Sequence, residues 1–169
     1  MADVTPVGAK NLLVRRALEP NTRVLFGLTV QRNDLVAGLP DGTECLQWFT
    51  CNDNPLFESV GSDVYIGESL SLIGCPKLSI IGRNLMVRGD LHLADCPRLA
   101  TIGNGLDVGG RLNLSGCSLD IQLPREGRVG DTLILPNGFS RAAIPADFTF
   151  GKLCFLDYSY FPPDYASFQ

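Results

Sequence analysis

The sequence has one histidine, few basic residues and no long apolar run, and each shortage excludes a class of function. A single His, His92, among 169 residues excludes a His cluster for zinc and leaves little material for a catalytic triad. Lys and Arg number 14 against 18 Asp and Glu, so the formal net charge is −4 and a nucleic-acid partner is not expected. No stretch approaches the ~18 apolar residues of a membrane span. The length and the 45% hydrophobic content predict one domain with a core.

What the sequence does contain is a repeat. The segment LSLIGC at 70–75 recurs as LHLADC at 91–96 and as LNLSGC at 112–117, so the step between copies is constant. A fourth copy at 133–138 keeps the step and loses the cysteine. We align 46–51 (LQWFTC) with these copies at a step of 24, and we add 28–33 upstream and a degraded copy at 153–157.

The repeat pattern predicts short strands. In L-x-L, alternate side chains point to opposite faces, so the leucines point inward and the residue between them points outward. A second alternation precedes it at 64–66, 85–87 and 106–108, with Tyr65, Met86 and Asp107 pointing outward. Each unit then holds two short strands and a turn. A coil of ~21 residues cannot bury its own apolar face, so the coils must stack, with Leu70, Leu91 and Leu112 in one column.

The pattern L-x-L-x-x-(C/N) resembles a leucine-rich repeat. The resemblance covers residues 24–157, about seven coils, and Leu39-Pro40 and Leu123-Pro124 are similar to the short repeats of secreted bacterial effectors. It implies a β-rich solenoid: a right-handed coil stack with a parallel β-sheet, little helix and capped ends. It also implies a non-enzymatic protein-binding module, located in the cytoplasm or secreted by a bacterial effector system into a host cytosol.

The six cysteines allow two interpretations. Cys51, Cys75, Cys96 and Cys117 fall at one place in the aligned repeat, where Asn33 stands in an earlier copy. They form either a disulfide framework or a ladder of buried thiols. Parallel coils ~4.8 Å apart fit poorly with the ~5.5–6 Å Cα separation of disulfides, which favours the ladder. Without C-x-x-C or a nearby His, zinc is not expected, and buried free thiols indicate a reducing compartment.

The two ends lack the repeat. Residues 1–23 form an N-terminal cap with a short helix at 11–19, which Asn11 would begin and Pro20 would stop; a secretion signal is the alternative. Residues 158–169 are rich in aromatic side chains and are expected to cap the last coil. They include the sequence PPDY at 162–165, which matches the P-P-x-Y ligand of WW domains.

The candidate site is the row of outward residues on the L-x-L strands. No charge concentrates there, and apolar points in a polar surround are typical of protein interfaces. A solvated sheet face is the alternative. The candidate partner-binding residues are Gln47, Phe49, Ser71, Ile73, His92, Asn113 and Ile134.

Catalysis is not expected on this row. Ser71, His92 and Asn113 would be column neighbours, and no acid stands in that column to orient a base, because Asp95 is three positions further along. Asp63, Asp90 and Asp131 are interpreted as turn residues. We therefore expect no catalytic residue, cofactor or metal. The alternatives are a solenoid enzyme acting on a polymer such as a polysaccharide, and a structural unit that stacks end to end.

Overall fold

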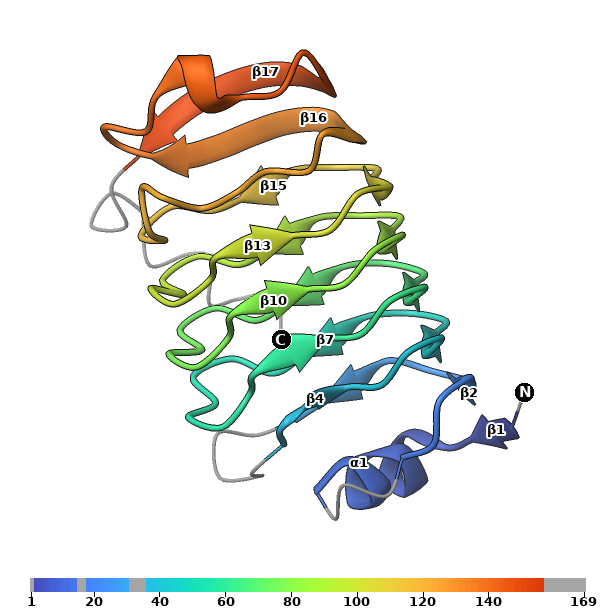
Figure 1. The fold of residues 1–169 in the computed structure, drawn as a ribbon. Helices are drawn as coiled ribbons and strands as arrows, with labels where there is room; N and C mark the ends of the chain where they lie inside the picture. Colours follow the sequence, from blue (N-terminus) through green and yellow to red (C-terminus); the bar gives the residue numbers. More distant parts are fainter. Residues whose placement is uncertain (1, 15–17, 31–35, 157–169) are drawn as a thin grey trace.

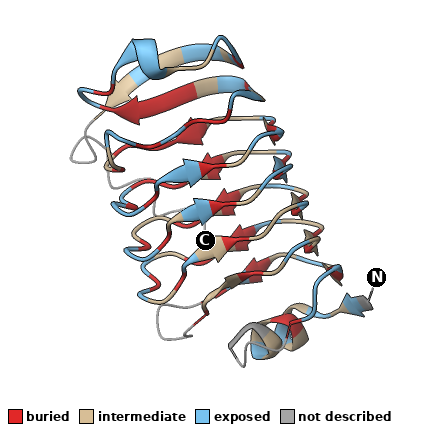
Figure 2. Cartoon of the chain, in the orientation of Figure 1, coloured by how far each residue is buried: buried red, intermediate tan, exposed pale blue. Residues whose placement is uncertain are grey.

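The chain folds as a parallel β-solenoid. The computed structural model describes residues 2–14, 18–30 and 36–156, which form about seven stacked coils with 7% helix. The coils repeat every 21 residues or so and rise from helix α1 at one end to strand β17 at the other (Figure 1). Figure 2 shows that buried positions recur on the strands of every coil, so one continuous core runs along the axis of the stack. The predicted fold class is confirmed at this level.

Each coil has three sides, and the strands of each side form a column. The first side, from the L-x-L segments, has β3 (Leu28–Thr29), β6 (Phe49–Thr50), β9 (Leu70–Ser71), β12 (Leu91–His92) and β15 (Leu112–Asn113). The second has β1 (Ala2–Val4), β2 (Thr22–Val24), β5 (Glu44–Cys45), β8 (Tyr65–Ile66), β11 (Met86–Val87) and β14 (Leu106–Val108). The third has β4 (Gly38–Leu39), β7 (Ser59–Val60), β10 (Ile80–Ile81) and β13 (Thr101–Ile102).

The last described coils join the first two sides. Strand β16 (Glu126–Pro136) pairs with β14 near its start and with β15 near its end, and β17 (Asp147–Leu156) pairs along β16. A short 3-10 helix, η1 (Arg141–Ala143), connects them. The expectation of two strands per unit is therefore wrong, because the third side forms a sheet of its own. In the sequence, the strands of this third side are marked by isoleucine followed by glycine, at Ile81-Gly82 and at Ile102-Gly103. Both isoleucines are buried.

The register confirms the leucine column and corrects its upstream part. Leu91 pairs with Leu70 on one side and with Leu112 on the other. Phe49, however, pairs with both Leu28 and Leu70, so the constant step holds here too and the predicted step of 24 is wrong. Phe49 takes the inward position because an aromatic ring fills it as well as leucine does. Its ring packs 6.3 Å from the ring of Phe57, centroid to centroid.

The thiol ladder is confirmed at three of its four predicted positions. A buried cysteine on one coil donates a hydrogen bond to a backbone carbonyl of the preceding coil. This contact links neighbouring coils inside the core and satisfies a buried acceptor. The pairs are Cys75 to Cys51 O (3.1 Å), Cys96 to Leu72 O (3.1 Å) and Cys117 to Leu93 O (3.0 Å).

The fourth predicted member, Cys51, is not in the ladder. The corrected register places Cys51 at the third residue of its L-x-L segment, where it supplies the carbonyl that Cys75 uses. The ladder position of that coil is Asn54, which is fully buried and whose Oδ1 accepts a hydrogen bond from the Leu56 N–H at 3.0 Å. Asn33 lies outside the described residues. All six cysteines are free thiols.

We expect only one of these thiols to react quickly with Ellman's reagent at pH 8. Cys154 is exposed, whereas the other five are buried. Burial raises the pKa of Cys45 and of Cys117 from 9.0 to about 11, so the thiolate fraction of each falls by about 100-fold. Addition of denaturant should release the other five. A second fast thiol in the folded protein would contradict the buried ladder.

Two turns in each coil use left-handed backbone. One turn recurs at Asn21, Gly42, Asp63, Asn84 and Gly105, and the other at Asp53, Gly74, Asp95 and Gly116, all with φ between 53° and 78°. Only Gly, Asn and Asp occur there, because these residues tolerate positive φ best. The turn interpretation of Asp63 is confirmed. That of Asp131 is wrong, because Asp131 lies within β16.

The N-terminal segment differs from its prediction in detail. Helix α1 spans Pro6–Val14, so the predicted bounds of 11–19 are wrong and Asn11 is an interior residue. Thr5 is the cap: its Oγ1 accepts the Gly8 N–H at 3.3 Å, and Pro6 takes the first helical position, where a missing N–H costs nothing. The helix packs on β3. The predicted cap at 158–169, with its P-P-x-Y motif, lies outside the described residues.

Candidate functional site

The first side of the solenoid presents a continuous row of middle residues, which we call the outward row. Its members are Thr29, Thr50, Ser71, His92, Asn113 and Ile134. The predicted neighbours Ser71, His92 and Asn113 are in register, as expected. Accessibility changes along the row. Thr29 is exposed, whereas Asn113 and Ile134 are only 3% and 8% exposed.

Three predicted site residues do not belong to the outward row. Phe49 is 1% exposed and part of the core, so its predicted outward position is wrong, and Thr50 takes that position. Gln47 lies at the corner before β6, where its Oε1 accepts the Gly27 N–H at 2.9 Å. Ile73 lies in the turn after β9 and is half-buried; its N–H donates to Asn52 Oδ1 at 2.9 Å. Partner binding by any of the seven predicted residues stays a prediction.

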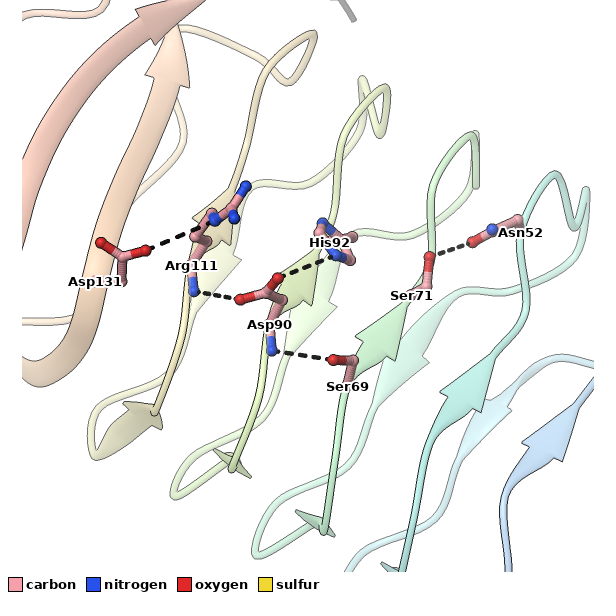
Figure 3. Close-up of polar contacts among 7 residues, drawn as sticks. All are labelled: Asn52, Ser69, Ser71, Asp90, His92, Arg111 and Asp131. Carbon is pink, nitrogen blue, oxygen red and sulfur yellow. Dashed lines mark hydrogen bonds and ion pairs between the residues drawn. The ribbon is translucent and has the colours of Figure 1, made fainter. Parts of the chain in front are cut away.

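His92 has an acidic neighbour that the sequence analysis missed. Asp90 Oδ2 lies 3.8 Å from His92 Nε2; Asp90 directly precedes β12, and His92 is the second residue of that strand (Figure 3). Asp90 lies outside the column of Ser71, His92 and Asn113, to which the expectation of no orienting acid referred. Residues two apart in an extended chain point the same way, so the spacing of Asp90 and His92 in the sequence already predicts that their side chains lie on one face.

Asp90 is also the centre of a polar chain that crosses coils (Figure 3). Its Oδ1 accepts the Arg111 backbone N–H at 2.8 Å, and its own N–H donates to Ser69 Oγ at 3.1 Å. The Arg111 side chain lies 3.7 Å from Asp131 Oδ2. Asp90 thus holds the corner before β12 through hydrogen bonds to the neighbouring coils and also contacts the imidazole. The main role of its carboxylate is therefore to stabilise the local structure.

The surroundings favour the neutral form of His92. Burial lowers the pKa of His92 below its usual 6.5, Asp90 opposes that shift, and Arg111 adds to it. The neighbouring Ser71 hydroxyl donates its proton to Asn52 Oδ1 at 2.8 Å, so this proton points away from the imidazole. A serine nucleophile must instead donate to its base. The arrangement therefore suits recognition through hydrogen bonds better than acyl transfer.

A second feature of this side lies at the corner before its first strands, and we call it the aromatic corner: Phe26, Gly27 and Trp48. The indole of Trp48 packs directly on Gly27, where a Cβ would approach three ring atoms at 2.3–2.6 Å. The indole Nε1–H donates to Thr29 Oγ1 at 3.3 Å. Both aromatic side chains face solvent, with Trp48 41% and Phe26 57% exposed. The sequence spacing predicts this contact only at the constant step of 21, which places Trp48 on Gly27; the incorrect step of 24 separates the two residues.

Within the described ranges, no three His, Cys, Asp or Glu side chains gather as a metal-binding group. Those ranges also contain no helix with the length and apolar character needed to span a membrane. On the second side, charges are paired between coils, as in Arg23–Glu44 (3.0 Å) and Arg128–Asp107 (3.1 Å).

Comparisons of the chain with protein-family models, with curated proteins and with solved structures return no match. The fold itself, with coils of about 21 residues, is compatible with a short-repeat solenoid. What the protein does must therefore be inferred from the outward row and the aromatic corner.

Proposed function

We propose that this chain is a non-enzymatic protein-interaction module that binds a partner protein through the aromatic corner and the adjoining part of the outward row. The observation that carries the proposal is the exposed pair Phe26 and Trp48 beside the neutral hydroxyls of Thr29 and Thr50. Large aromatic side chains exposed in a polar surround are the usual anchors of protein interfaces, and Trp is the residue most enriched at their hot spots.

The packing of Trp48 supports this role. Gly27 lies beneath the indole and Thr29 accepts its N–H, so the ring is held in place before a partner arrives. A side chain that is already ordered loses little conformational entropy on binding, and that saving appears as affinity.

The chemistry of the row supports a protein partner over an ionic ligand. Thr29, Thr50 and Ser71 are uncharged, and burial favours the neutral form of His92. Such a surface offers hydrogen bonds without attracting phosphate or a polyanion. Of the predicted binding residues, we retain Ser71 and His92 as contacts at the edge of the site. Asn113 and Ile134 lie at the buried end of the row and are expected to contribute less.

The resemblance of the sequence to leucine-rich repeats supports the same class of function, because such repeats commonly bind proteins through their strand face. A bacterial effector in a host cytosol and a cytoplasmic bacterial protein would both keep the five buried thiols reduced. We propose one of these two settings. A search for the partner should begin with cytosolic proteins.

Trp48→Ala is expected to weaken capture of the partner by about 30-fold, the loss typical of a hot-spot residue. The measurement compares the proteins retained from a cytosolic extract by the immobilised full chain and by its variants. Thr50→Arg should act in the same direction, because it places a charge in the middle of the neutral row. Ile80→Ala is the matched control, since Ile80 is 51% exposed on the third side. Equal retention by wild type and both site variants would refute the proposed surface.

A further inference from the structure

We propose that two copies of this chain bind each other through their second sides, in a closed dimer whose two-fold axis lies between strands β8 and β11. The inference concerns a different surface from the proposed binding site and does not depend on it. It rests on a change in the sign of charge from one coil to the next. Every charged residue between positions 41 and 68 is acidic, and every charged residue between positions 77 and 88 is basic.

The centre of this surface is an apolar pair, Tyr65 and Met86. The two residues pair across β8 and β11, and both take the outward position of their strands. Met86 is 38% exposed and Tyr65 is half-buried. Tyrosine and methionine are enriched at protein interfaces, and the flexible thioether adapts to the shape of a facing side chain.

Four charged residues surround the apolar pair. Asp63 and Glu68 flank β8, Arg83 and Arg88 flank β11, and all four are exposed. Within the described ranges, none of the four forms an ion pair. Asp63 accepts a hydrogen bond from the neutral Asn84 side chain at 2.8 Å, which leaves its charge uncompensated. We call the six residues the central patch: Asp63, Tyr65, Glu68, Arg83, Met86 and Arg88.

The outward residues above and below the central patch are already neutralised within the chain. Arg23 pairs with Glu44 at 3.0 Å towards the first coil, and Arg128 pairs with Asp107 at 3.1 Å towards the last. Neither pair carries a net charge. The uncompensated charges of the outward column and its flanks are therefore concentrated in two adjacent coils, one acidic and one basic.

A two-fold axis between these coils makes the central patch complementary to itself. Rotation about an axis parallel to the strands reverses the order of the coils, so β8 of each copy faces β11 of the other. Asp63 then faces Arg83 of the second copy, and Glu68 faces Arg88 of the second copy. An isologous interface makes each contact twice. A parallel arrangement would instead place the acidic coil on the acidic coil, so charge complementarity favours the antiparallel dimer.

The size of the second side predicts weak association. From β2 to β16 it extends about 24 Å at ~4.8 Å a strand, and from Asp63 to Glu68 it is about 17 Å wide. Each copy would then cover roughly 400 Å², which is at the low end for transient complexes. We expect a dissociation constant of about 100 μM at low ionic strength. Because exposed ion pairs are screened by salt, association should weaken in about 0.5 M NaCl.

Sedimentation equilibrium of the full chain tests the dimer by mixing two variants. Glu68→Arg and Arg88→Glu each place like charges opposite one another twice, so each variant alone should associate at least about tenfold more weakly than the wild type. An equimolar mixture of the two should regain association, because one variant then has only basic and the other only acidic side chains at these positions. An ion pair within one chain cannot produce this recovery.

Arg98→Glu is the matched control, since it makes the same change in net charge at an exposed turn outside the second side. It should associate like the wild type, and circular dichroism should show that every variant is folded. A wild type that stays monomeric up to about 1 mM, a dimer unaffected by Arg88→Glu, or a mixture without recovery would each overturn the inference. Masses that grow beyond the dimer would overturn it too, because a two-fold interface closes after two copies.

Discussion

Replacing Gly82 with alanine is expected to lower the free energy of unfolding by about 3 kcal/mol, the upper end of the usual range for overpacking. A Cβ at this position would lie 2.4 Å from the carbonyl carbon and oxygen of Gly61 and 2.5 Å from the Ser62 nitrogen. All three are backbone atoms, so no side chain can rotate away. The coils cannot separate cheaply either, because the Gly82 N–H donates to Val60 O at 2.8 Å.

The matched control for this substitution is Gly8→Ala. Gly8 lies in helix α1, where a Cβ would meet only Thr5 Oγ1 at 3.3 Å. Alanine is favoured over glycine in a helix by about 0.5–1 kcal/mol, so this variant should match the wild type or exceed it. Urea unfolding followed by circular dichroism gives both free energies. A Gly82→Ala protein within about 0.5 kcal/mol of wild type would contradict the close stacking of Gly61 and Gly82.

The leucine column and the thiol ladder could be predicted because both depend on local alternation repeated at a fixed step. Once Leu70, Leu91 and Leu112 recur at equal intervals, period-two geometry places each leucine inward and stacking aligns them. The same step puts Cys75 and Cys96 one above the other. No knowledge of distant contacts was needed for either feature.

The candidate site was predicted less well. It depends on how the upstream coil aligns with the others, and in that coil a residue other than leucine takes the first inward position. Leu46 matched the repeat by residue type, yet the constant step from Leu28 leads to Phe49. That shift in register assigned a core aromatic to the surface. It also hid Trp48, whose exposure depends on a glycine in the preceding coil. The fixed step was a better guide than the identity of the side chain.

Other features follow from contacts that no repeat encodes. The cap of helix α1 is Thr5 with Pro6 after it, a local signal that was overlooked in favour of Asn11. The acid beside His92 is Asp90, which is held in place by the backbone of the next coil at Arg111. Only the packed structure shows that one carboxylate faces both groups.

Leu91→Ala in the middle of the stack should have an effect comparable to that of Gly82→Ala. Leu91 is fully buried between Leu70 and Leu112, and removal of its side chain is expected to cost about 2–5 kcal/mol. The cavity cannot collapse easily, because the Leu91 N–H donates to Arg111 O at 2.8 Å and fixes the coil. Urea unfolding should show the loss, and Ile80→Ala on the third side should change stability by less than about 1 kcal/mol.

The shape of the unfolding transition should also depend on which coil carries the leucine-to-alanine substitution. In a solenoid each coil contacts only its neighbours, so stability is close to a sum of coil and interface contributions. A weakened central coil separates two halves that each retain several coils, whereas the same change at Leu28 weakens only the end next to helix α1. Leu91→Ala should therefore broaden the unfolding transition and lower its apparent m-value, and Leu28→Ala should leave most of the transition intact. Equal m-values for the two variants would show that the coils unfold as one cooperative unit, with the coupling between them stronger than the cost of a cavity.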